Sequence, residues 1–368
     1  MMFDRRLIQH FDWGLMLLTL MICFIGLMTL HSAVSAGLDG GDQAYFMRQM
    51  VWYGAGLVAM TAVMVFDYRN IDRWSYVIYG GIMVLLICVL FFGKTAGGSR
   101  RWLVFGPVSL QPSELAKIAV IVILSRYYSR RVKPGGFTLR ELIYPALLTI
   151  IPFGLIVEQP DLGTGLTVLL ISGSMTLLVK VERRTFLFLG GIGAIAFPLV
   201  WFFLKEYQQQ RILTFLDPNR DPLGAGYHII QSKIAIGSGM IAGKGFLKGT
   251  QNTLSFLPEQ HTDFIFSVLA EEWGFIGASL SVLIFLTLII WGLNIAYRCK
   301  DPFGTILSFG AAALIFWQTF INLGMVMGLL PVVGMPLPLI SYGGSSVLTI
   351  MICIGMLMNV SMRQFSAD

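Results

Sequence analysis

Long apolar runs separated by short polar or basic segments dominate the pattern along the whole chain. Hydrocarbon about 30 Å thick needs about 20 mostly apolar residues per helix, and runs near this size recur throughout. Backbone groups inside a bilayer must be hydrogen-bonded within their own segment, so we expect these runs to be helices. The runs are Trp13–Val34, Val51–Phe66, Tyr76–Phe92, Leu115–Tyr127, Leu142–Val157, Gly163–Val179, Thr185–Leu204, Phe264–Tyr297, Phe303–Leu330 and Leu339–Met362.

This pattern predicts an all-α polytopic membrane protein with about ten transmembrane helices. The last three runs have room for a bent or re-entrant portion. Composition agrees, because 56% of the residues are hydrophobic and only 12% are charged, about half the charged fraction of a soluble domain. No soluble domain, short-period repeat or low-complexity linker is evident, so residues 1–368 are expected to form a single membrane domain.

Basic residues favour one orientation of the chain. If the N-terminus is cytoplasmic, the inside segments hold most of the 26 lysines and arginines, beginning with Arg5 and Arg6. This bias predicts that both termini are cytoplasmic. It also accounts for most of the net charge of +6, so we expect anionic membrane lipids as partners and no nucleic acid. The first run is longer than a signal-peptide core and is read as a retained helix.

The segment 205–262 is far longer than the other connections and falls outside the membrane, between the seventh and eighth runs. Long ordered loops are disproportionately functional. Within it, His228–Ile236 is an apolar stretch interrupted by polar residues and followed by glycines. This pattern indicates a helix lying on the membrane surface.

Asp263 is the strongest candidate for chemistry. It lies in LPEQHTDFIFSVLAEEWG (Leu257–Gly274), where a polar loop turns into the eighth run, and we expect it in the first helical turn at the outer boundary. An acid there could simply complement the helix N-terminus, worth about 0.3–1 kcal/mol. A carboxylate half out of water beside Phe264 and Phe266 could also be a general base for a sugar hydroxyl. Position alone leaves both interpretations open.

Further polar residues lie inside the apolar runs. Glu271 and Glu272 lie two turns beyond Asp263, and acids in such runs are usually functional or paired. Gln318 and Asn322, one helical turn apart in the ninth run, are expected to hold helices together.

A second external segment, Gly97–Lys117, leads into the fourth run. Arg100 and Arg101 offer forked donors suited to a phosphate, and Lys117 offers a point charge. The alternative for Glu114 and Lys117 is a local helix pair, while Pro112 and Ser113 are expected to start the helix.

Asp161, in EQPDLGTG, adds a third acid on the external face, with helix capping as the alternative role. Residues Pro336–Ser346, PLPLISYGGSS, supply tight backbone geometry. The four scattered cysteines indicate neither disulfides nor a zinc site. No nucleotide-binding fingerprint is present, so no nucleotide cofactor is expected.

Five of these motifs together resemble the SEDS family (shape, elongation, division and sporulation) over nearly the whole chain: QPSELAKIAV, EQPDLGTGL, DPLGAGYHIIQSKIAIGSG, LPEQHTDFIFSVLAEEWG and GMPLPLISYGGSS. The stretch YHIIQSKIAIGSGMIAGKGFLKGTQ is more similar to the elongation branch than to the division branch. The resemblance implies a peptidoglycan glycosyltransferase that polymerises lipid II on the periplasmic face of the bacterial inner membrane during cell-wall elongation. It implies a class B penicillin-binding protein as the transpeptidase partner, with elongation-complex proteins such as MreC and MreD.

The resemblance also assigns roles to residues. The essential acid of the HTDF motif falls on Asp263, and other important family positions fall on Glu114, Lys117 and Asp161. The hypothesis is that Asp263 takes the proton of the acceptor hydroxyl in one inverting transfer, and undecaprenyl pyrophosphate leaves. Lys117, Arg100, Arg101 or Arg211 could bind the pyrophosphate, together with a divalent cation such as Mg²⁺ or Mn²⁺.

Two other functions stay open. One is a lipid II flippase or transporter, whose site would lie near the bilayer midplane. The other is a non-catalytic scaffold for the transpeptidase.

Overall fold

The structure, a computed structural model, describes residues 10–35, 43–96, 99–106, 108–131, 133, 135–221, 224–253 and 260–363. Arg5, Arg6, Gly97 and residues 254–259 of the long loop lie outside this part. The helices are α2 (Trp13–Ser35), α3 (Gln43–Val65), α4 (Tyr68–Phe92), α5 (Pro112–Ser129), α6 (Leu139–Glu158), α7 (Leu162–Leu178), α8 (Arg183–Phe203), α9 (Glu206–Leu216), η1 (Pro218–Arg220), α10 (Ala225–Ser238), α11 (Thr250–Thr253), α12 (Ile265–Arg298), α13 (Pro302–Val326) and α14 (Gly344–Arg363).

The predicted all-α polytopic membrane fold is confirmed. Each predicted apolar run corresponds to one long helix, although α3 and α4 begin at Gln43 and Tyr68, well before the apolar residues alone indicate. Helix α4 starts early because the side chain of Asp67 accepts a hydrogen bond from the amide of Arg69 and caps its first turn. In the described part of the chain, α2, α4, α6, α12, α13 and α14 are long and apolar enough to cross a membrane, and α7 is a shorter apolar helix.

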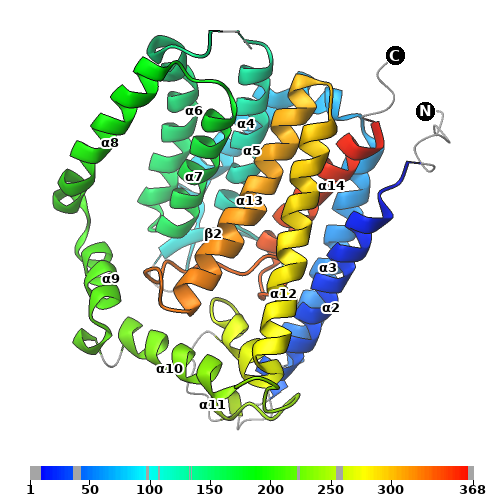
Figure 1. Ribbon diagram of the computed structural model, residues 1–368, viewed down its shortest axis with the longest axis vertical. Coiled ribbons are helices and arrows are strands. Elements are labelled where there is room, and N and C mark those ends of the chain that lie inside the picture. Colours follow the sequence, from blue (N-terminus) through cyan, green and yellow to red (C-terminus); the bar gives the residue numbers. More distant parts are fainter. Residues whose placement is uncertain are drawn as a thin grey trace.

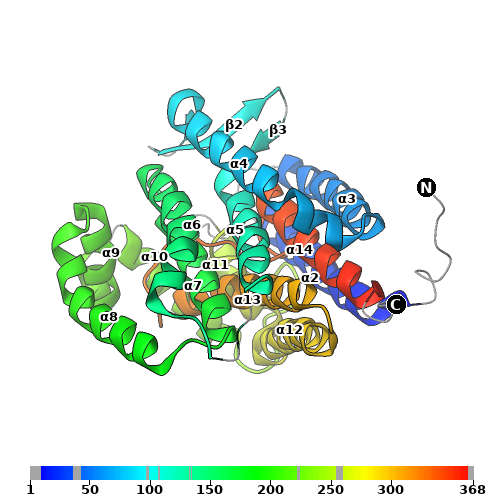
Figure 2. The same cartoon turned by 90° about the horizontal axis from the view of Figure 1, so that it is seen from above.

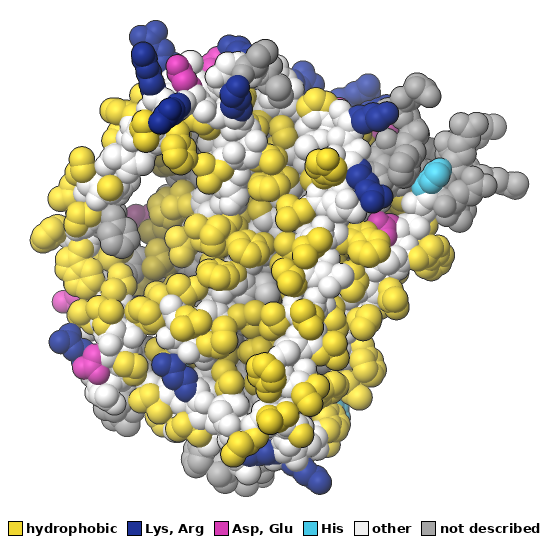
Figure 3. All heavy atoms as spheres, in the orientation of Figure 1, with side chains coloured by type: hydrophobic (Ala, Val, Ile, Leu, Met, Phe, Trp, Pro, Cys, Tyr) yellow, Lys and Arg dark blue, Asp and Glu magenta, His cyan; other side chains and the backbone are white. Residues whose placement is uncertain are grey.

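Helices α5, α13 and α14 form the interior of the bundle (Figures 1 and 2). Nearly every residue of α5 is buried, because α4, α7 and α13 pack around it, while α14 packs along α3. The outer helices expose apolar side chains, and these cover the middle of the face shown in Figure 3. Lysines and arginines gather along the upper edge of the same view. An apolar belt with basic residues at one end suits a bilayer.

The ends of the bundle differ. Helix α2 begins and α14 ends at the same end, where the Ser361 hydroxyl donates to the Asp12 carboxylate (3.0 Å). The described part of the long loop after α9 lies at the opposite end, where α10 runs crosswise below the bundle (Figure 1). The helix expected over His228–Ile236 is the central part of α10. Its contact with a membrane surface stays a prediction.

The last runs are bent or interrupted, as expected. Helix α12 breaks at Gly274, whose φ of 65° and ψ of −163° are not helical. Residues 327–343 between α13 and α14 are irregular, and Gly328 and Gly334 there have positive φ. The ninth run therefore ends at Val326, and the tenth begins at Gly344.

A small antiparallel sheet stands where only a loop was expected. Its strands are β1 (Lys94–Ala96), β2 (Ser99–Phe105) and β3 (Val108–Leu110), in the order β1-β2-β3. The aromatic and β-branched residues of SRRWLVF favour a strand. The sheet leads directly into α5 and so places Arg101 close to the start of that helix.

Candidate functional site

Asp263 lies in a turn that is held from two sides. Its carbonyl oxygen accepts a hydrogen bond from Asn322 Nδ2 of α13 (2.9 Å), and the same amide group donates to the Met335 carbonyl (2.6 Å). The hydroxyl of Ser341 donates to the Thr262 carbonyl (2.5 Å). The backbone of the turn is therefore fixed by α13 and by the irregular segment before α14.

Asp263 is only partly buried, although its neighbours Phe264 and Phe266 are buried. It lies beside Gly334, where an added Cβ would come within 3.3 Å of Asp263 Oδ2. The N-cap of α12 is Phe264, so Asp263 lies two residues before the helix rather than in its first turn. Asp263 therefore lies next to the N-terminus of α12, where both roles that its position allowed, a helix-end acid and a general base, stay predictions.

Glu114 and Lys117 form a buried ion pair on α5. Lys117 Nζ donates to Glu114 Oε1 (2.8 Å) and to Gln318 Oε1 on α13 (3.3 Å). An ammonium group has three donors, so one N–H of Lys117 remains beyond these two contacts. Glu114 Oε2 is buried without a hydrogen-bond partner in the described part of the chain.

The same network continues toward Asp263. Gln318 Nε2 donates to the Pro336 carbonyl (3.1 Å) and to Ser346 Oγ (3.0 Å), which ties α13 to the irregular segment and to α14. Asn322 follows one turn later and holds the turn of Asp263. The expected role of Gln318 and Asn322 as residues that hold helices together is confirmed.

Asp161 is the N-cap of α7 and also binds α5. Its Oδ1 accepts from the amide of Thr164 (3.4 Å), and its Oδ2 accepts from Gln111 Nε2 (2.9 Å) and Ser113 Oγ (3.0 Å). Sequence reasoning missed Gln111. Its backbone amide also donates to Ser345 Oγ on α14 (3.0 Å), so it joins three helices. Its place as the first residue of QPSELAKIAV could have drawn attention to it.

The two arginines of β2 behave differently. Arg101 Nε donates to the Gln159 carbonyl (3.2 Å), and its Nη2 donates to the Pro160 carbonyl, so its guanidinium covers the C-terminal end of α6 next to Asp161. Arg100 is exposed, and neighbouring strand residues face opposite sides. The structure therefore brings Arg101, but not Arg100, into this group.

Arg211 reaches the site from α9. Burial lowers the pKa of its guanidinium, and the positive charge of Arg101 lowers it further, while Tyr207, Asp263 and Asp161 act in the opposite direction. These interactions place Arg211 within electrostatic range of both external acids. Its guanidinium also lies 5.8 Å from the centre of the Tyr207 ring.

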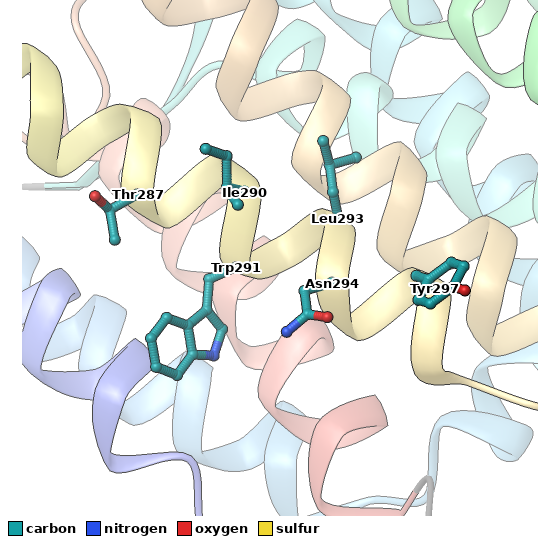
Figure 4. Close-up of a pocket in the computed structure, with 6 residues that line it drawn as sticks. All are labelled: Thr287, Ile290, Trp291, Leu293, Asn294 and Tyr297. Carbon is teal, nitrogen blue, oxygen red and sulfur yellow. The ribbon is translucent and has the colours of Figure 1, made fainter.

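No group of three metal-ligating side chains (His, Cys, Asp or Glu) occurs among the described residues. A cavity of about 410 Å³ lies elsewhere, on the outer surface of α12, lined by Thr287, Ile290, Trp291, Leu293, Asn294 and Tyr297 (Figure 4). It lies along the second half of α12, far from Asp263 at the other end, and it contains no acid or base. The candidate site residues lie instead at the end of the bundle that holds Asp263.

Comparison with known proteins shows the family of the chain. A family model described as a cell cycle protein, covering FtsW, RodA and SpoVE, matches residues 10–365. The chain belongs to the SEDS family. This SEDS chain is 42% identical to the peptidoglycan glycosyltransferase MrdB of Escherichia coli (strain K12) over 93% of this chain and 92% of that protein. It is 32% identical to the peptidoglycan glycosyltransferase RodA of Treponema pallidum over 98% of this chain and 99% of that one.

Solved structures of SEDS proteins have the same fold. One, described as showing structural coordination of polymerization and crosslinking by a peptidoglycan synthase complex, gives a TM-score of 0.83 at 32% identity, over 97% of this chain and 99% of that one. The rod shape determining protein RodA of Thermus thermophilus gives a TM-score of 0.71 at 28% identity, over 96% and 98% of the two chains. The similarity to MrdB supports the RodA-type assignment predicted from the sequence.

Proposed function

We propose that this chain is a peptidoglycan glycosyltransferase of the RodA type, which polymerises lipid II during cell-wall elongation. The observation that carries the proposal is Asp263: a partly exposed carboxylate on a turn whose backbone is fixed by Asn322, within electrostatic range of Arg211. The names of MrdB and of the Treponema RodA support the activity.

In this mechanism Asp263 is the general base. Its carboxylate takes the proton of the GlcNAc 4-hydroxyl as that oxygen attacks the anomeric carbon of the donor MurNAc. A new C–O bond forms on one face of the sugar while the bond to the pyrophosphate breaks on the other, so an α-linked donor gives a β-linked product. Undecaprenyl pyrophosphate leaves with the bonding electrons, and Asp263 returns its proton to solvent. One carboxylate is sufficient.

The leaving pyrophosphate needs positive charge nearby. Arg211 is the first candidate because it interacts with the charges of Asp263 and Asp161. Arg101 contributes its charge beside Asp161 while its hydrogen bonds hold α6. Lys117 has one N–H beyond its two contacts, and Glu114 keeps that ammonium oriented. Exposed Arg100 serves as an outer contact.

A divalent cation fits the residues present only if the substrate supplies most of its ligands. Mg²⁺ is usually held by one or two carboxylates together with phosphates and water, and Asp263 supplies one partly exposed carboxylate. Mg²⁺ or Mn²⁺ would add positive charge at the pyrophosphate.

Lipid II is proposed to arrive through the membrane. Helix α8 stands apart at the edge of the bundle in Figures 1 and 2 and is exposed over most of its length. The surface is hollowed on that side in Figure 3.

Most basic residues lie at the end of the bundle away from Asp263. The proposed orientation therefore places the site in the periplasm and both termini in the cytoplasm of a bacterium with an inner membrane.

A class B penicillin-binding protein is the proposed partner. The structural neighbour from a peptidoglycan synthase complex supports it, since that complex is described as coordinating polymerization with crosslinking. MreC and MreD are proposed as further partners from the family resemblance alone.

The arrangement of acids favours an enzyme over a transporter. Glu271 and Glu272 are the carboxylates inside α12 that a transport site could use, and both accept hydrogen bonds from the chain itself. Asp263 lies instead just before the N-terminus of α12. This placement suits chemistry on a lipid headgroup at the membrane surface.

One experiment separates the functions. Purified protein with its transpeptidase partner is supplied with lipid II, and glycan strands are measured for the wild type and for Asp263→Ala. We expect polymer from the wild type and almost none from a variant that is folded and still binds the partner. Undiminished synthesis by Asp263→Ala would overturn the catalytic role, and lipid II movement across vesicles without polymer would favour the transporter.

A further inference from the structure

A second cationic site lies at the end of the bundle opposite Asp263. A cavity of about 370 Å³ opens there among the connections α5–α6, α7–α8 and α12–α13. Its lining residues are Lys133, Phe137, Leu178, Val179, Lys180, Lys300, Pro302, Thr305 and Ile306. None of them has a role in the proposed polymerisation. Figure 3 shows lysines and arginines gathered along this edge of the molecule.

The walls of this cavity are held together by backbone contacts. The amide of Phe137 donates to the Lys180 carbonyl (2.8 Å), and the amide of Glu182 donates to the Phe137 carbonyl (3.1 Å), as a parallel bridge between Phe137 and Val181. Gly136 has φ of +87°, and a Cβ there would lie 2.8 Å from the Lys180 carbonyl oxygen. The connections α5–α6 and α7–α8 therefore form one fixed wall, and a ligand would meet a preformed site.

The cavity combines an apolar floor with a cationic rim. Phe137, Val179 and Ile306 are buried, whereas Leu178 lines the cavity and is 42% exposed toward the outside of the bundle. A small soluble anion would gain nothing from contact with the apolar floor. A molecule with an anionic head and a hydrocarbon chain matches both parts.

The charges that face the cavity favour an anion. Each of the three connections supplies one lysine, and the acids beside them are Glu141, Glu182 and Asp301. Glu141 accepts from Lys133 and from the amide of Thr138 (3.0 Å), while Asp301 caps α13 by accepting from the amide of Gly304 (2.9 Å). Lys300 makes no ion pair within the described residues. The N-terminus of α13 adds positive potential at the same place and the C-terminus of α7 at Leu178 adds negative potential, so the preference for an anion comes from the lysines.

We propose that this cavity binds the phosphate headgroup of an anionic phospholipid from the adjacent leaflet. Lys180 and Lys300 contact the phosphate, the Lys133–Glu141 pair borders it, and one acyl chain lies against Leu178. The bound lipid bridges three connections whose helices, α5, α7 and α13, carry Lys117, Asp161 and Asn322 to the far end. The proposal does not depend on the enzymatic activity.

The test uses the full chain, purified in detergent and examined by native mass spectrometry. Dioleoyl phosphatidylglycerol is titrated against dioleoyl phosphatidylcholine, which has the same chains but no net charge. We expect the wild type to bind phosphatidylglycerol at least about tenfold more tightly than phosphatidylcholine, because each charge-assisted hydrogen bond to a phosphate is about twice as strong as a neutral one. Equal binding of the two lipids would overturn the proposal.

Variants locate the site. Lys180→Gln/Lys300→Gln should abolish the preference for phosphatidylglycerol. The matched control Arg73→Gln/Arg130→Gln, which removes the same charge from exposed positions outside the cavity, should keep it. Retention of the preference by the lysine variant, or its loss in the control alone, would contradict the assignment.

A third arm identifies the source of the phosphate. Glycerophosphoglycerol, the soluble headgroup without acyl chains, should not compete at concentrations where the lipid saturates; competition at equal concentration would show a site for free phosphate esters instead. A photoactivatable phosphatidylglycerol should label the wild type within residues 133–137, 178–180 or 300–306. Labelling confined to other segments would overturn the proposal even if the lysine variant failed to fold.

Discussion

Acids eight residues apart, one just before α12 and the others inside it, differ in what surrounds them. Glu271 and Glu272 are fully buried near the break of α12, whereas Asp263 lies at its mouth and is partly exposed. Glu271 Oε1 accepts from Lys244 Nζ (2.6 Å) and from the amides of Thr250 (2.8 Å) and Gln251 (3.1 Å). Asp263 is held through its carbonyl oxygen, which accepts a hydrogen bond from Asn322 of α13.

The loop that contacts Glu271 also forms hydrogen bonds with the backbone groups on both sides of the break in α12. The amide of Phe275 donates to the Met240 carbonyl (2.9 Å), and the amides of Lys244 and Gly245 donate to the carbonyls of Glu271 (3.0 Å) and Glu272 (2.9 Å). Ser32 of α2 donates to Glu272. Glu271 and Glu272 are thus paired residues that fix the long loop. A buried acid that accepts hydrogen bonds from its own chain is structural, whereas a partly exposed acid such as Asp263 can meet a substrate.

The largest expected effect is at Asp263. Replacement by Asn keeps the shape and the backbone contact with Asn322 but removes the base, so polymerisation should fall about 10²- to 10⁴-fold. Thermal unfolding of the purified variant should match the wild type. If Asp263→Asn polymerises lipid II at more than a tenth of the wild-type rate, Asp263 is not the general base and does not differ in function from Glu271 and Glu272.

Glu271 should show the opposite behaviour. Glu271→Leu leaves the ammonium of Lys244 and two backbone amides without their buried acceptor, so the free energy of unfolding should fall by about 3–5 kcal/mol. Thermal unfolding in detergent measures this loss. Glu271→Gln is the control, because its amide oxygen still accepts from Thr250 and Gln251, and it should lose less. A stable Glu271→Leu protein with reduced activity would indicate a direct role in catalysis.

Arg211 tests whether the leaving group is held at the Asp263 end. Arg211→Gln removes one charge-assisted contact to the pyrophosphate, worth about 1.5–3 kcal/mol, so kcat/KM should fall roughly 10- to 100-fold. Arg100→Gln is the matched control on the exposed face of β2 and should change the rate much less. Equal losses of kcat/KM in the two variants would contradict the assignment of Arg211 to the pyrophosphate.

The smallest effect is expected at Lys244. Lys244→Met removes one donor of several to Glu271, and Lys244 is itself partly exposed, so the unfolding free energy should fall by about 1–2 kcal/mol. Lys248→Met, at an exposed position on the same loop, should change it very little. A loss at Lys244 as large as that of Glu271→Leu would show that the ion pair, rather than the amide contacts, fixes the loop.

The sequence by itself determined the helices and their order. Apolar runs set the membrane segments because hydrocarbon admits only internally bonded backbone, and this constraint acts on each segment alone. The motif HTDF singled out Asp263, and Lys117, Glu114 and Asp161 followed from their own motifs. Sequence could not predict the sheet over 94–110, because β pairing joins residues whose apolar pattern is short and ambiguous.

Only the tertiary structure decided what each polar residue does. Gln318 and Asn322 reach residues in other segments, Gln111 joins α5, α7 and α14, and Glu271 meets Lys244 across the loop. Arg101 turns toward the site while its neighbour Arg100 does not. The physical reason is that a hydrogen bond depends on distances of about 3 Å between atoms, and packing sets those distances between segments far apart in the chain.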